Sequence, residues 1–470
     1  MPCTQPQPTS FEPPAYALRV LEALEAAGHE AWIVGGWVRD CLRGMPGHDI
    51  DVCTSALWQQ TEEVLLAAGV EVHQTGTQHG TVTAVVEGKP VEVTTYRVEG
   101  TYSDLRHPDE VRFVRDVRED LGRRDFTINA MAWHPTRGLL DPYGGRDDLA
   151  AGIIRCVGDP HARLSEDALR VLRAVRFASR MGFDVEPATE AALVDCADGL
   201  AAVASERIGI ELCGIVGEGY AGRALMAWPE VMCAAVPELA AMRGFDQRSP
   251  YHEFDVWEHT ARVCWGAEAF CGGVASEELR WAALFHDMAK PQCASVDANG
   301  RGHFFGHPEQ SAQLAAKAMR RLALPTDLVR RTCCLVRLHD YELRGAVRSA
   351  RAVRRLVARI EATVPGEGWR LAHELVCLMR ADALAKARRF TGWAVELDRV
   401  EAVMRRERQA SLALSVRELA VGGRDVIETC GIEPGPQVGV ILDWLLERVL
   451  EGELANRREV LLDALGSYCR

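Results

Sequence analysis

Strand-forming patterns are confined to the first third of this chain, and this asymmetry limits the folds that it can adopt. Short apolar runs bounded by glycine predict strands before about residue 145. From about Asp159 onward, helical patterns rich in Ala, Leu, Arg and Glu run to the C-terminus and are interrupted at prolines. We therefore expect an α+β protein, with a small mixed sheet and its helices at the N-terminus and an all-helical remainder.

Local signals place the elements of the N-terminal region. Residues 15–27 have helical spacing and end at Gly28. AWIVGG predicts a short strand that stops at Gly35 and Gly36, WVRDCLRG predicts a short helix, and HDIDVCTS alternates as a strand does. TVTAVVEGKPVEVTTYR predicts a hairpin with its turn at residues 87–90.

Composition narrows the class of protein. The chain has 470 residues, 48% apolar and 26% charged, which is typical of globular proteins of more than one domain. Its net charge of −13 means that a nucleic-acid partner must bind to local basic patches. The 15 cysteines are scattered without a C-x-x-C, so we expect neither a disulfide framework nor a zinc ribbon, and a reducing, cytoplasmic location. The sequence predicts no signal peptide and no membrane span.

The first chemical signal is a glycine pair followed by two aspartates. Asp49 and Asp51 are two positions apart in a predicted strand, so their carboxylates share a face and repel each other unless a cation lies between them. Mg²⁺ prefers such oxygen ligands, completed by phosphates and water. Gly35 and Gly36 allow backbone N–H groups to approach a phosphate, and Arg39 lies one turn into the next helix, where it can reach a triphosphate.

The second signal is a row of charges: Asp167, Arg170, Arg173 and Arg176 recur at every third position of one predicted helix. Because each step of three residues drifts by about −60°, neighbours can cooperate but all four cannot face one spot. Asp167 and Arg170 therefore form one expected pair, and Arg173 and Arg176 form another.

The aspartate–arginine pair suits the choice of a nucleobase. Cytosine and adenine each present an amino donor beside a ring-nitrogen acceptor, which match a carboxylate and a guanidinium. Uracil and guanine present a carbonyl acceptor and an N–H donor, and these would confront Asp167 with an acceptor and Arg170 with a donor. One such pair admits C and A and rejects U and G without a template. The alternative is a simple salt bridge on a helix.

Together these motifs resemble the class II tRNA nucleotidyltransferase and poly(A) polymerase family. G-G-W-V-R-D-C-L-R-G and D-I-D-V resemble the start of its head domain, and the resemblance is dense from residue 31 to about 215. Four further segments resemble the flexible loop, the ribose-binding motif, the head-to-neck connection and the nucleotide-selecting helix: residues 94–109, 120–132, 141–149 and 165–178.

The resemblance implies a polymerase β-like nucleotidyltransferase head followed by an elongated all-α neck, body and tail. The implied regions are an N-terminal arm and helix (1–30), the head (31–150), the neck (151–215), a body that contains an HD domain (216–405) and a tRNA-binding tail (406–470).

The resemblance also implies residue roles. Asp49 and Asp51 would be catalytic and would hold two Mg²⁺ ions with the nucleotide, and Glu92 is a weaker candidate for a further acid. The implied nucleotide contacts are Gly36, Arg39, Arg124, Asp167, Arg170, Arg173 and Arg176.

The implied activity is template-independent addition or repair of the 3′-terminal CCA of tRNA with CTP and ATP. The RNA 3′-hydroxyl would attack the nucleotide α-phosphate and pyrophosphate would leave. The loop at residues 94–109 disfavours an enzyme that adds only CC. An A-adding enzyme, a poly(A) polymerase, or an HD-domain phosphohydrolase as the main activity stay open as alternatives.

A second set of metal-binding residue types recurs in the helical region, in an order that resembles the HD phosphohydrolase domain. The implied activity is a metal-dependent phosphatase or cyclic phosphodiesterase, with a transition metal or Mg²⁺; an inert HD fold is the alternative. Either Asp340 or Asp382 would supply the last carboxylate of this ordered set, and we favour Asp382. The implied metal ligands are His259, His286, Asp287 and Asp382, and the order also includes His307 and His339.

Arginine-rich segments such as residues 344–359 give the C-terminal half local basic character. They predict either a salt-bridged helix surface or a face that binds RNA phosphates.

Overall fold

The computed structural model of the chain describes residues 11–47, 49–100, 111–341, 350–409 and 413–470. Most of the predicted loop at residues 94–109, and the first part of the arginine-rich segment 344–359, lie outside these ranges. The chain divides into two compact units, Met1–Glu211 and Leu212–Arg470.

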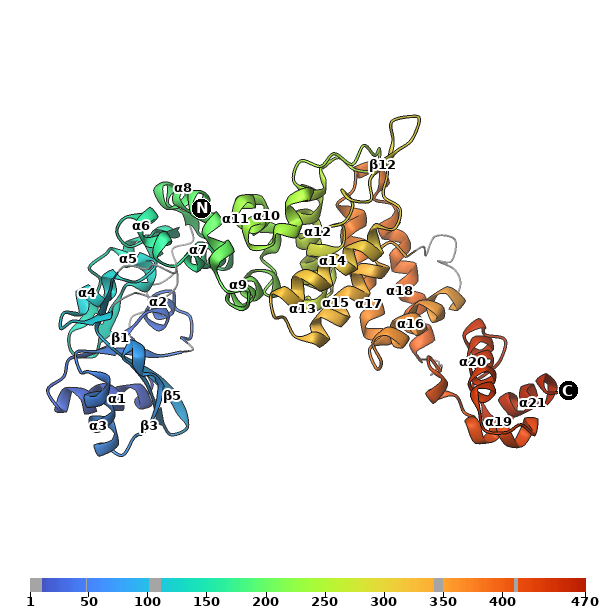
Figure 1. Cartoon of the computed structure of the whole chain (residues 1–470), viewed down its shortest axis with the longest axis horizontal. Coiled ribbons are helices and arrows are strands. Elements are labelled where there is room, and N and C mark those ends of the chain that lie inside the picture. Colours follow the sequence, from blue (N-terminus) through green and yellow to red (C-terminus); the bar gives the residue numbers. More distant parts are fainter. Residues whose placement is uncertain (1–10, 48, 101–110, 342–349, 410–412) are drawn as a thin grey trace. The chain divides into compact units, whose positions relative to one another are not determined.

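The first unit is built on a mixed seven-stranded sheet (Figure 1), in the order β3-β4-β5-β2-β1-β8-β9. The β2–β5 pair is parallel and its neighbours are antiparallel. Helices α1 and α3 pack on the sheet. The predicted hairpin is confirmed as β4 and β5, joined at Glu87 and Gly88. The strands are β1 (Ala31–Val34), β2 (Asp51–Thr54), β3 (Glu71–Gly76), β4 (Thr81–Val86), β5 (Lys89–Thr95), β8 (Ala132–His134) and β9 (Gly138–Leu140).

The two aspartates of the D-I-D motif do not share a strand, so this part of the prediction is wrong. Strand β2 begins at Asp51, and Asp49 precedes it and is exposed. The apolar side chains of β2, Val52 and Cys53, are buried and fix the register in which Asp51 lies opposite Glu92 of β5.

The described part of the first unit contains nine α-helices, the last of which ends one residue beyond the unit. They are α1 (Ala15–Ala26), α2 (Gly36–Leu42), α3 (Trp58–Ala67), α4 (Val117–Gly122), α5 (Gly145–Ala151), α6 (Pro160–Glu166), α7 (Leu169–Met181), α8 (Pro187–Asp195) and α9 (Ser205–Leu212). Two short strands, β6 (Arg97–Glu99) and β7 (Val111–Phe113), pair outside the main sheet.

The single helix predicted over residues 165–178 is broken at Asp167. Helix α6 ends at Glu166, Asp167 has extended backbone angles (φ −140°, ψ 105°), and α7 begins at Leu169. The Asp167 carboxylate Oδ1 accepts a hydrogen bond from the backbone N–H of Leu169 at 3.1 Å. An aspartate that binds backbone N–H groups in this way competes with helix continuation, which explains why charge spacing alone missed the break.

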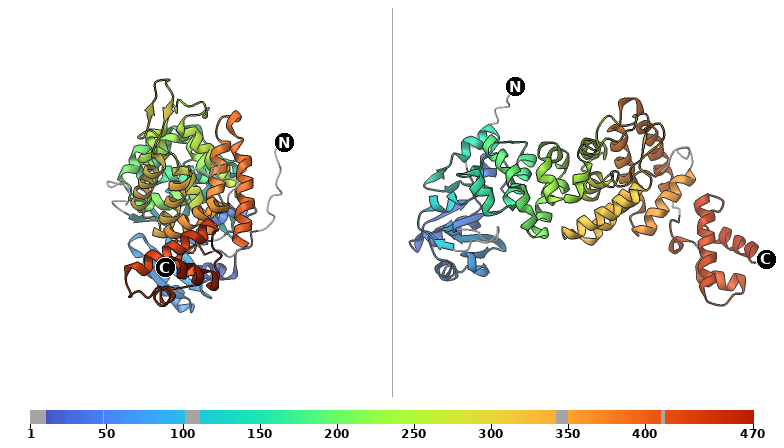
Figure 2. Two further views of the ribbon diagram at one scale, coloured as in Figure 1. Left: turned by 90° about the vertical axis from the view of Figure 1, so that its right-hand side faces the viewer. Right: turned by 45° about the horizontal axis from the view of Figure 1, so that its top comes forward.

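The second unit is helical, as expected, and its described residues contain no strand longer than two residues (Figure 2). No described helix is both long and apolar enough to cross a membrane. Its helices are α10 (Ala221–Ala227), α11 (Pro229–Ala235), α12 (Val256–Phe270), α13 (Glu277–Phe285), α14 (His307–Arg321), α15 (Thr326–Leu338), α16 (Ala350–Thr363), α17 (Gly368–Leu384), α18 (Trp393–Gln409), α19 (Gly423–Cys430), α20 (Pro436–Glu451) and α21 (Arg458–Tyr468).

The last three helices share a core that includes Leu445, Leu461 and Leu465. A disulfide joins Cys430, at the end of α19, to Cys469, just after α21. Its cysteines are 39 residues apart and are brought together by the packing of α19 against α21. Cysteine spacing carries no signal for such a contact, which is why this bond was not expected from the sequence.

Candidate functional sites

A cavity of about 500 Å³ in the first unit brings together most of the residues selected from the sequence. Seven arginines and three aspartates line it, and this excess of positive charge favours an anionic ligand such as a polyphosphate. The lining includes eight of the predicted residues: Gly36, Arg39, Asp51, Arg124, Asp167, Arg170, Arg173 and Arg176.

The acidic end of this cavity is Asp51, whose strand partner is Glu92. Burial and the neighbouring charges of Glu92 and Asp49 raise the pKa of Asp51 to about 6, although Arg124 opposes the shift. Carboxylates that repel one another in a half-buried site fit a divalent cation with oxygen ligands. The position of Asp51 beside Glu92 therefore suits a metal. Asp49 lies close enough for its charge to raise the pKa of Asp51 as well.

The glycine pair lets the backbone pass close to the cavity's arginines. Gly35 has φ +74°, a conformation that favours glycine, and a Cβ on it would lie 3.0 Å from Arg124 Nη1. Arg39 follows on α2, where its Nε donates to Asp40 and its Nη1 donates to Asn129 Oδ1, both at 2.9 Å. These contacts hold its guanidinium at the cavity wall.

Asp167 and Arg170 both line the cavity, but they do not bind each other as a salt bridge. Arg170 donates to the Glu166 carboxylate and, at 2.8 Å, to the carbonyl of Arg163. Asp167 Oδ2 accepts from Arg207 Nη2 at 2.7 Å. Asp167 and Arg170 therefore do not form the simple salt bridge that was the alternative from the sequence. Arg207 holds the Asp167 carboxylate, and Glu166 holds the Arg170 guanidinium.

Two buried acids hold the remaining pair of arginines. Arg173 donates to Asp125 at 2.9 Å, and Arg176 donates to Glu211 at 2.6 Å. Burial alone would raise the pKa of Asp125, but Arg173, Asn129 and Arg170 together outweigh it and lower this pKa to about 2. Neither acid was selected from the sequence, although Asp125 lies within the D-L-G-R-R-D-F-T-I-N-A segment that carried part of the resemblance.

A mixed sheet that places crowded carboxylates beside an arginine-lined cavity defines a nucleotidyltransferase of the polymerase β-like class, as expected for the head. Family comparisons agree: residues 31–155 match "Poly A polymerase head domain", residues 182–239 match "Probable RNA and SrmB- binding site of polymerase A", and residues 307–465 match a tRNA nucleotidyltransferase domain 2.

Whole-chain relatives identify the particular family. A CCA-adding enzyme of Geobacillus stearothermophilus is 34% identical over 450 residues, 94% of each chain. One from Limosilactobacillus fermentum is 32% identical over 467 residues, 98% of each chain. The crystal structure of the Bacillus stearothermophilus CCA-adding enzyme in complex with CTP matches with 31% identity and a TM-score of 0.69, over 97% of this chain and 98% of the other. The chain belongs to the CCA-adding enzyme family of tRNA nucleotidyltransferases.

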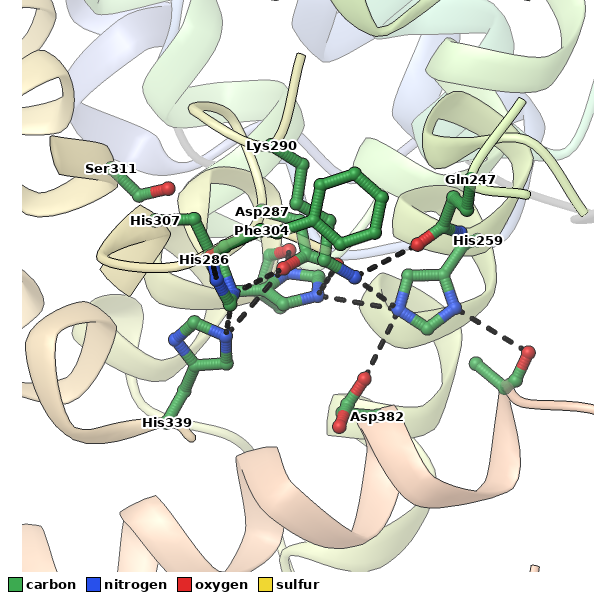
Figure 3. Close-up of polar contacts among 12 residues, drawn as sticks. Gln247, His259, His286, Asp287, Lys290, Phe304, His307, Ser311, His339 and Asp382 are labelled. Carbon is green, nitrogen blue, oxygen red and sulfur yellow. Dashed lines mark hydrogen bonds and ion pairs between the residues drawn. The ribbon is translucent and has the colours of Figure 1, made fainter. Parts of the chain in front are cut away.

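A second group of metal-binding side chains converges inside the helical unit (Figure 3). His259 Nε2 lies 3.1 Å from Asp382 Oδ1, 3.4 Å from Asp287 Oδ2 and 3.4 Å from His286 Nε2. His259 lies on α12 and Asp382 on α17, and His286 and Asp287 lie in the turn that follows α13. Their candidate ligand atoms all lie within 4.8 Å of one another, and all four residues are buried. Asp340, the alternative to Asp382, is exposed.

Asp287 also belongs to a second group, so two candidate metal positions share its carboxylate. Its Oδ1 lies 3.2 Å from His307 Nε2 and 3.5 Å from His339 Nε2. Burial alone would raise the pKa of Asp287, but His286 and Lys290 outweigh it and hold this pKa well below its usual range. Imidazole nitrogens turned toward one another and toward one carboxylate fit a metal centre.

The basic character predicted for residues 344–359 is largely neutralised in the described part of this segment. On α16, Arg351 and Arg355 pair with Glu451, and Arg354 pairs with Glu407 at 3.0 Å. The contacts favour a salt-bridged helix surface over a free phosphate-binding face.

Proposed function

We propose that this chain adds or repairs the 3′-terminal CCA of tRNA with CTP and ATP, without a template. The observation that carries the proposal is the single cavity that gathers eight sequence-selected residues in a member of the CCA-adding family. The CTP complex of the Bacillus stearothermophilus relative supports a nucleotide as the ligand.

Enzymes of this family depend on a metal, and we propose Asp49 and Asp51 as its ligands, with Glu92 as a neighbouring acid. Two Mg²⁺ ions bound there would supply charge that activates the attacking hydroxyl and stabilises the leaving pyrophosphate. The raised pKa of Asp51 supports this assignment, because a cation relieves the repulsion that raises it.

The chain's own residues bind and align the reactants. Arg39, Arg173 and Arg176 donate charge-assisted hydrogen bonds to the triphosphate, and the acids that hold them keep their guanidinium groups in place. Asp167 accepts from the exocyclic amino group of cytosine or adenine while Arg170 donates to the ring nitrogen. Alignment of the RNA 3′-hydroxyl with the α-phosphate is then the main remaining contribution of the protein.

Three tRNA substrates test this function: one that ends before CCA, one after C and one after CC. Each is incubated with Mg²⁺ and a labelled nucleotide, with and without the unlabelled partner nucleotide. We expect two C additions, one A addition and then a stop. Addition of A alone to the CC form would indicate an A-adding enzyme, and long A tails would indicate a poly(A) polymerase.

The raised pKa of Asp51 predicts a pH profile that depends on Mg²⁺. At limiting Mg²⁺, the rate of C addition is expected to fall as the pH decreases through about 6, because a proton then competes with the cation for this carboxylate. Higher Mg²⁺ concentrations should restore the rate and move the midpoint to lower pH. Initial rates between about pH 5 and pH 8 at several Mg²⁺ concentrations measure this. A midpoint that does not move with Mg²⁺ would contradict the assignment.

Replacing Gly35 with alanine is expected to raise the KM for CTP by about tenfold or more. The added Cβ would lie 3.0 Å from Arg124 Nη1, and the residue would have to keep φ +74°. Gly88 provides the matched control, because it also has a positive φ but a Cβ added there would have no atom within 4 Å. Steady-state kinetics of G35A and G88A distinguish a site effect from a general backbone effect.

A second function is supported by the convergence of His259, His286, Asp287 and Asp382. We propose that this HD centre holds a transition metal or Mg²⁺, which would supply a Lewis acid for hydrolysis of phosphate esters. Metal analysis of the purified protein, followed by assays with a phosphomonoester and a 2′,3′-cyclic nucleotide, tests it. A protein that neither retains metal nor hydrolyses either ester would leave the inert HD fold as the interpretation.

A further inference from the structure

Arg207 lies on α9 at the wall of the nucleotide cavity, and it was not among the residues selected from the sequence. Its Nη2 donates to Asp167 Oδ2 at 2.7 Å, and their side chains are only 26% and 18% exposed. The other carboxylate oxygen, Oδ1, accepts from the backbone N–H of Leu169 at 3.1 Å. One contact on each oxygen fixes the plane of the Asp167 carboxylate.

A second residue of α9, Glu211, holds two other arginines of the cavity. Glu211 lies one turn beyond Arg207, on the same face of the helix, and it holds Arg176 at 2.6 Å and approaches Arg173 at 3.6 Å. One short helix therefore supports both parts of the cavity: Arg207 contacts the carboxylate that would read the base, and Glu211 contacts the arginines that would bind phosphates.

Within the described residues, the Arg207 guanidinium makes no other side-chain hydrogen bond that would explain its position. Its Nη1 is buried without a hydrogen-bond partner among the described residues. The ion pair with Asp167 is thus its one strong polar contact in the described structure. A guanidinium nitrogen that is buried without a hydrogen-bond partner is costly for folding, so the position of Arg207 beside Asp167 points to the ligand site.

Selection of cytosine and adenine requires an oriented acceptor. The carboxylate must present a lone pair to the exocyclic amino group, and it must confront the carbonyl oxygen of uracil or guanine at the same place. A carboxylate free to rotate could turn away from that carbonyl, admit a water between them and lose the penalty for the wrong base. Rejection therefore depends on the residue that holds Asp167.

We propose that Arg207 is the positioning residue that sets nucleotide selectivity at Asp167. The proposal rests on the proposed CCA-adding function and deepens it, because it assigns selectivity to a pair that spans α9 and the break between α6 and α7. Arg207 acts through Asp167 and is not itself a catalytic residue.

The test compares Arg207→Gln with the wild type in single-nucleotide addition to tRNA that lacks CCA. The ratio of kcat/KM for CTP to that for UTP is expected to fall by about 10- to 100-fold, as when the partner that orients a ligating group is removed. Arg207→Lys keeps a cation and should recover part of this ratio. On tRNA that ends in CC, the ratio for ATP to GTP should change in the same direction.

Arg176→Gln is the matched comparison, because it removes an arginine from the same cavity wall without touching Asp167. It is expected to lower kcat/KM for all four nucleotides alike and to leave the ratios unchanged. If Arg207→Gln behaves like Arg176→Gln, Arg207 is another phosphate contact and the proposal fails. A lower KM with unchanged ratios would show that Arg207 competes with the nucleotide, which also overturns it.

Failure of the proposed CCA-adding function is distinguishable from failure of the Arg207 proposal, because in the first case the wild-type protein would add no C or A to these substrates. Thermal unfolding of each variant separates loss of fold from loss of selectivity. If Arg207→Gln does not fold, Arg207→Lys provides the test. The lysine side chain is shorter and binds Asp167 imperfectly, so the kcat/KM ratios should still fall, and unchanged ratios in this variant would refute the proposal.

Discussion

Replacing Asp51 with asparagine is expected to reduce CCA addition by about 1000-fold or more, equivalent to about 4 kcal/mol of transition-state stabilisation. Asparagine has the same shape but lacks the charge that a divalent cation requires. Burial and neighbouring acids raise the pKa of Asp51, so the ionised carboxylate is unfavourable in the metal-free fold once the pH exceeds about 6. D51N without metal should therefore unfold at the same or a higher Tm than wild type at neutral pH.

The combination of lost activity and retained stability distinguishes a metal ligand from a structural residue. Single-turnover C addition measures the first quantity, and thermal unfolding in EDTA measures the second. Glu71→Gln is a matched control, since Glu71 is an exposed carboxylate on β3 of the same sheet. Activity of D51N within tenfold of the E71Q control would refute Asp51 as a metal ligand.

The sequence predicted the architecture because hydrophobic periodicity is local. Residues 31–34, 81–86 and 89–95 form strands as the short apolar and β-rich runs indicated, and the described residues after Asp159 form helices and no strand longer than two residues. The exception is Asp167: its charge fits the three-residue spacing of the arginines, but its side chain binds the N–H of Leu169 and interrupts the helix. Periodicity records which face a residue prefers and does not record such side-chain-to-backbone contacts.

The cavity was predictable in its ligand-facing residues and not in those that hold them. Asp167 and Arg176 were selected from a motif, whereas Arg207 and Glu211, which hold them, lie more than thirty positions away and meet them only through tertiary packing. The disulfide between Cys430 and Cys469 has the same origin, because two helices bring together cysteines that are distant in sequence. Supporting contacts of this kind depend on the fold, so one sequence read alone does not reveal them.

The two candidate centres lie in different units, and their chemistry is separable by mutation. The nucleotide cavity is lined by residues of Met1–Glu211, and the histidine–aspartate centre by residues of Leu212–Arg470. Their ligand types differ as well: carboxylate oxygens suit Mg²⁺, while imidazoles also suit transition metals. A variant of one centre should therefore leave the intrinsic chemistry of the other unchanged.

Replacing Asp287 with asparagine is expected to remove bound metal and reduce phosphate-ester hydrolysis by about 100-fold or more, while C and A addition to tRNA persists. Asp287 is the one residue shared by both groups of candidate ligands, so its loss affects both metal positions. Elemental analysis after dialysis measures the metal, and the two activities are assayed on the same preparation. His303→Gln is the control, because His303 belongs to neither group but lines the cavity of about 570 Å³ onto which Asp287 and Asp382 also open.

The buried ammonium of Lys290 complicates this substitution, because it lies 2.6 Å from Asp287 Oδ2 and would lose its ion partner. Breaking a buried pair in this way costs about 3–5 kcal/mol. The pKa of Asp287 is held below its usual range, so the stability from its ionised form is present at neutral pH and is lost as the pH falls toward that lowered pKa. The double variant D287N/K290M removes both charges and separates the metal effect from this instability. Full metal retention in the double variant would refute the HD centre, and parallel loss of CCA addition would show that the two units do not act independently.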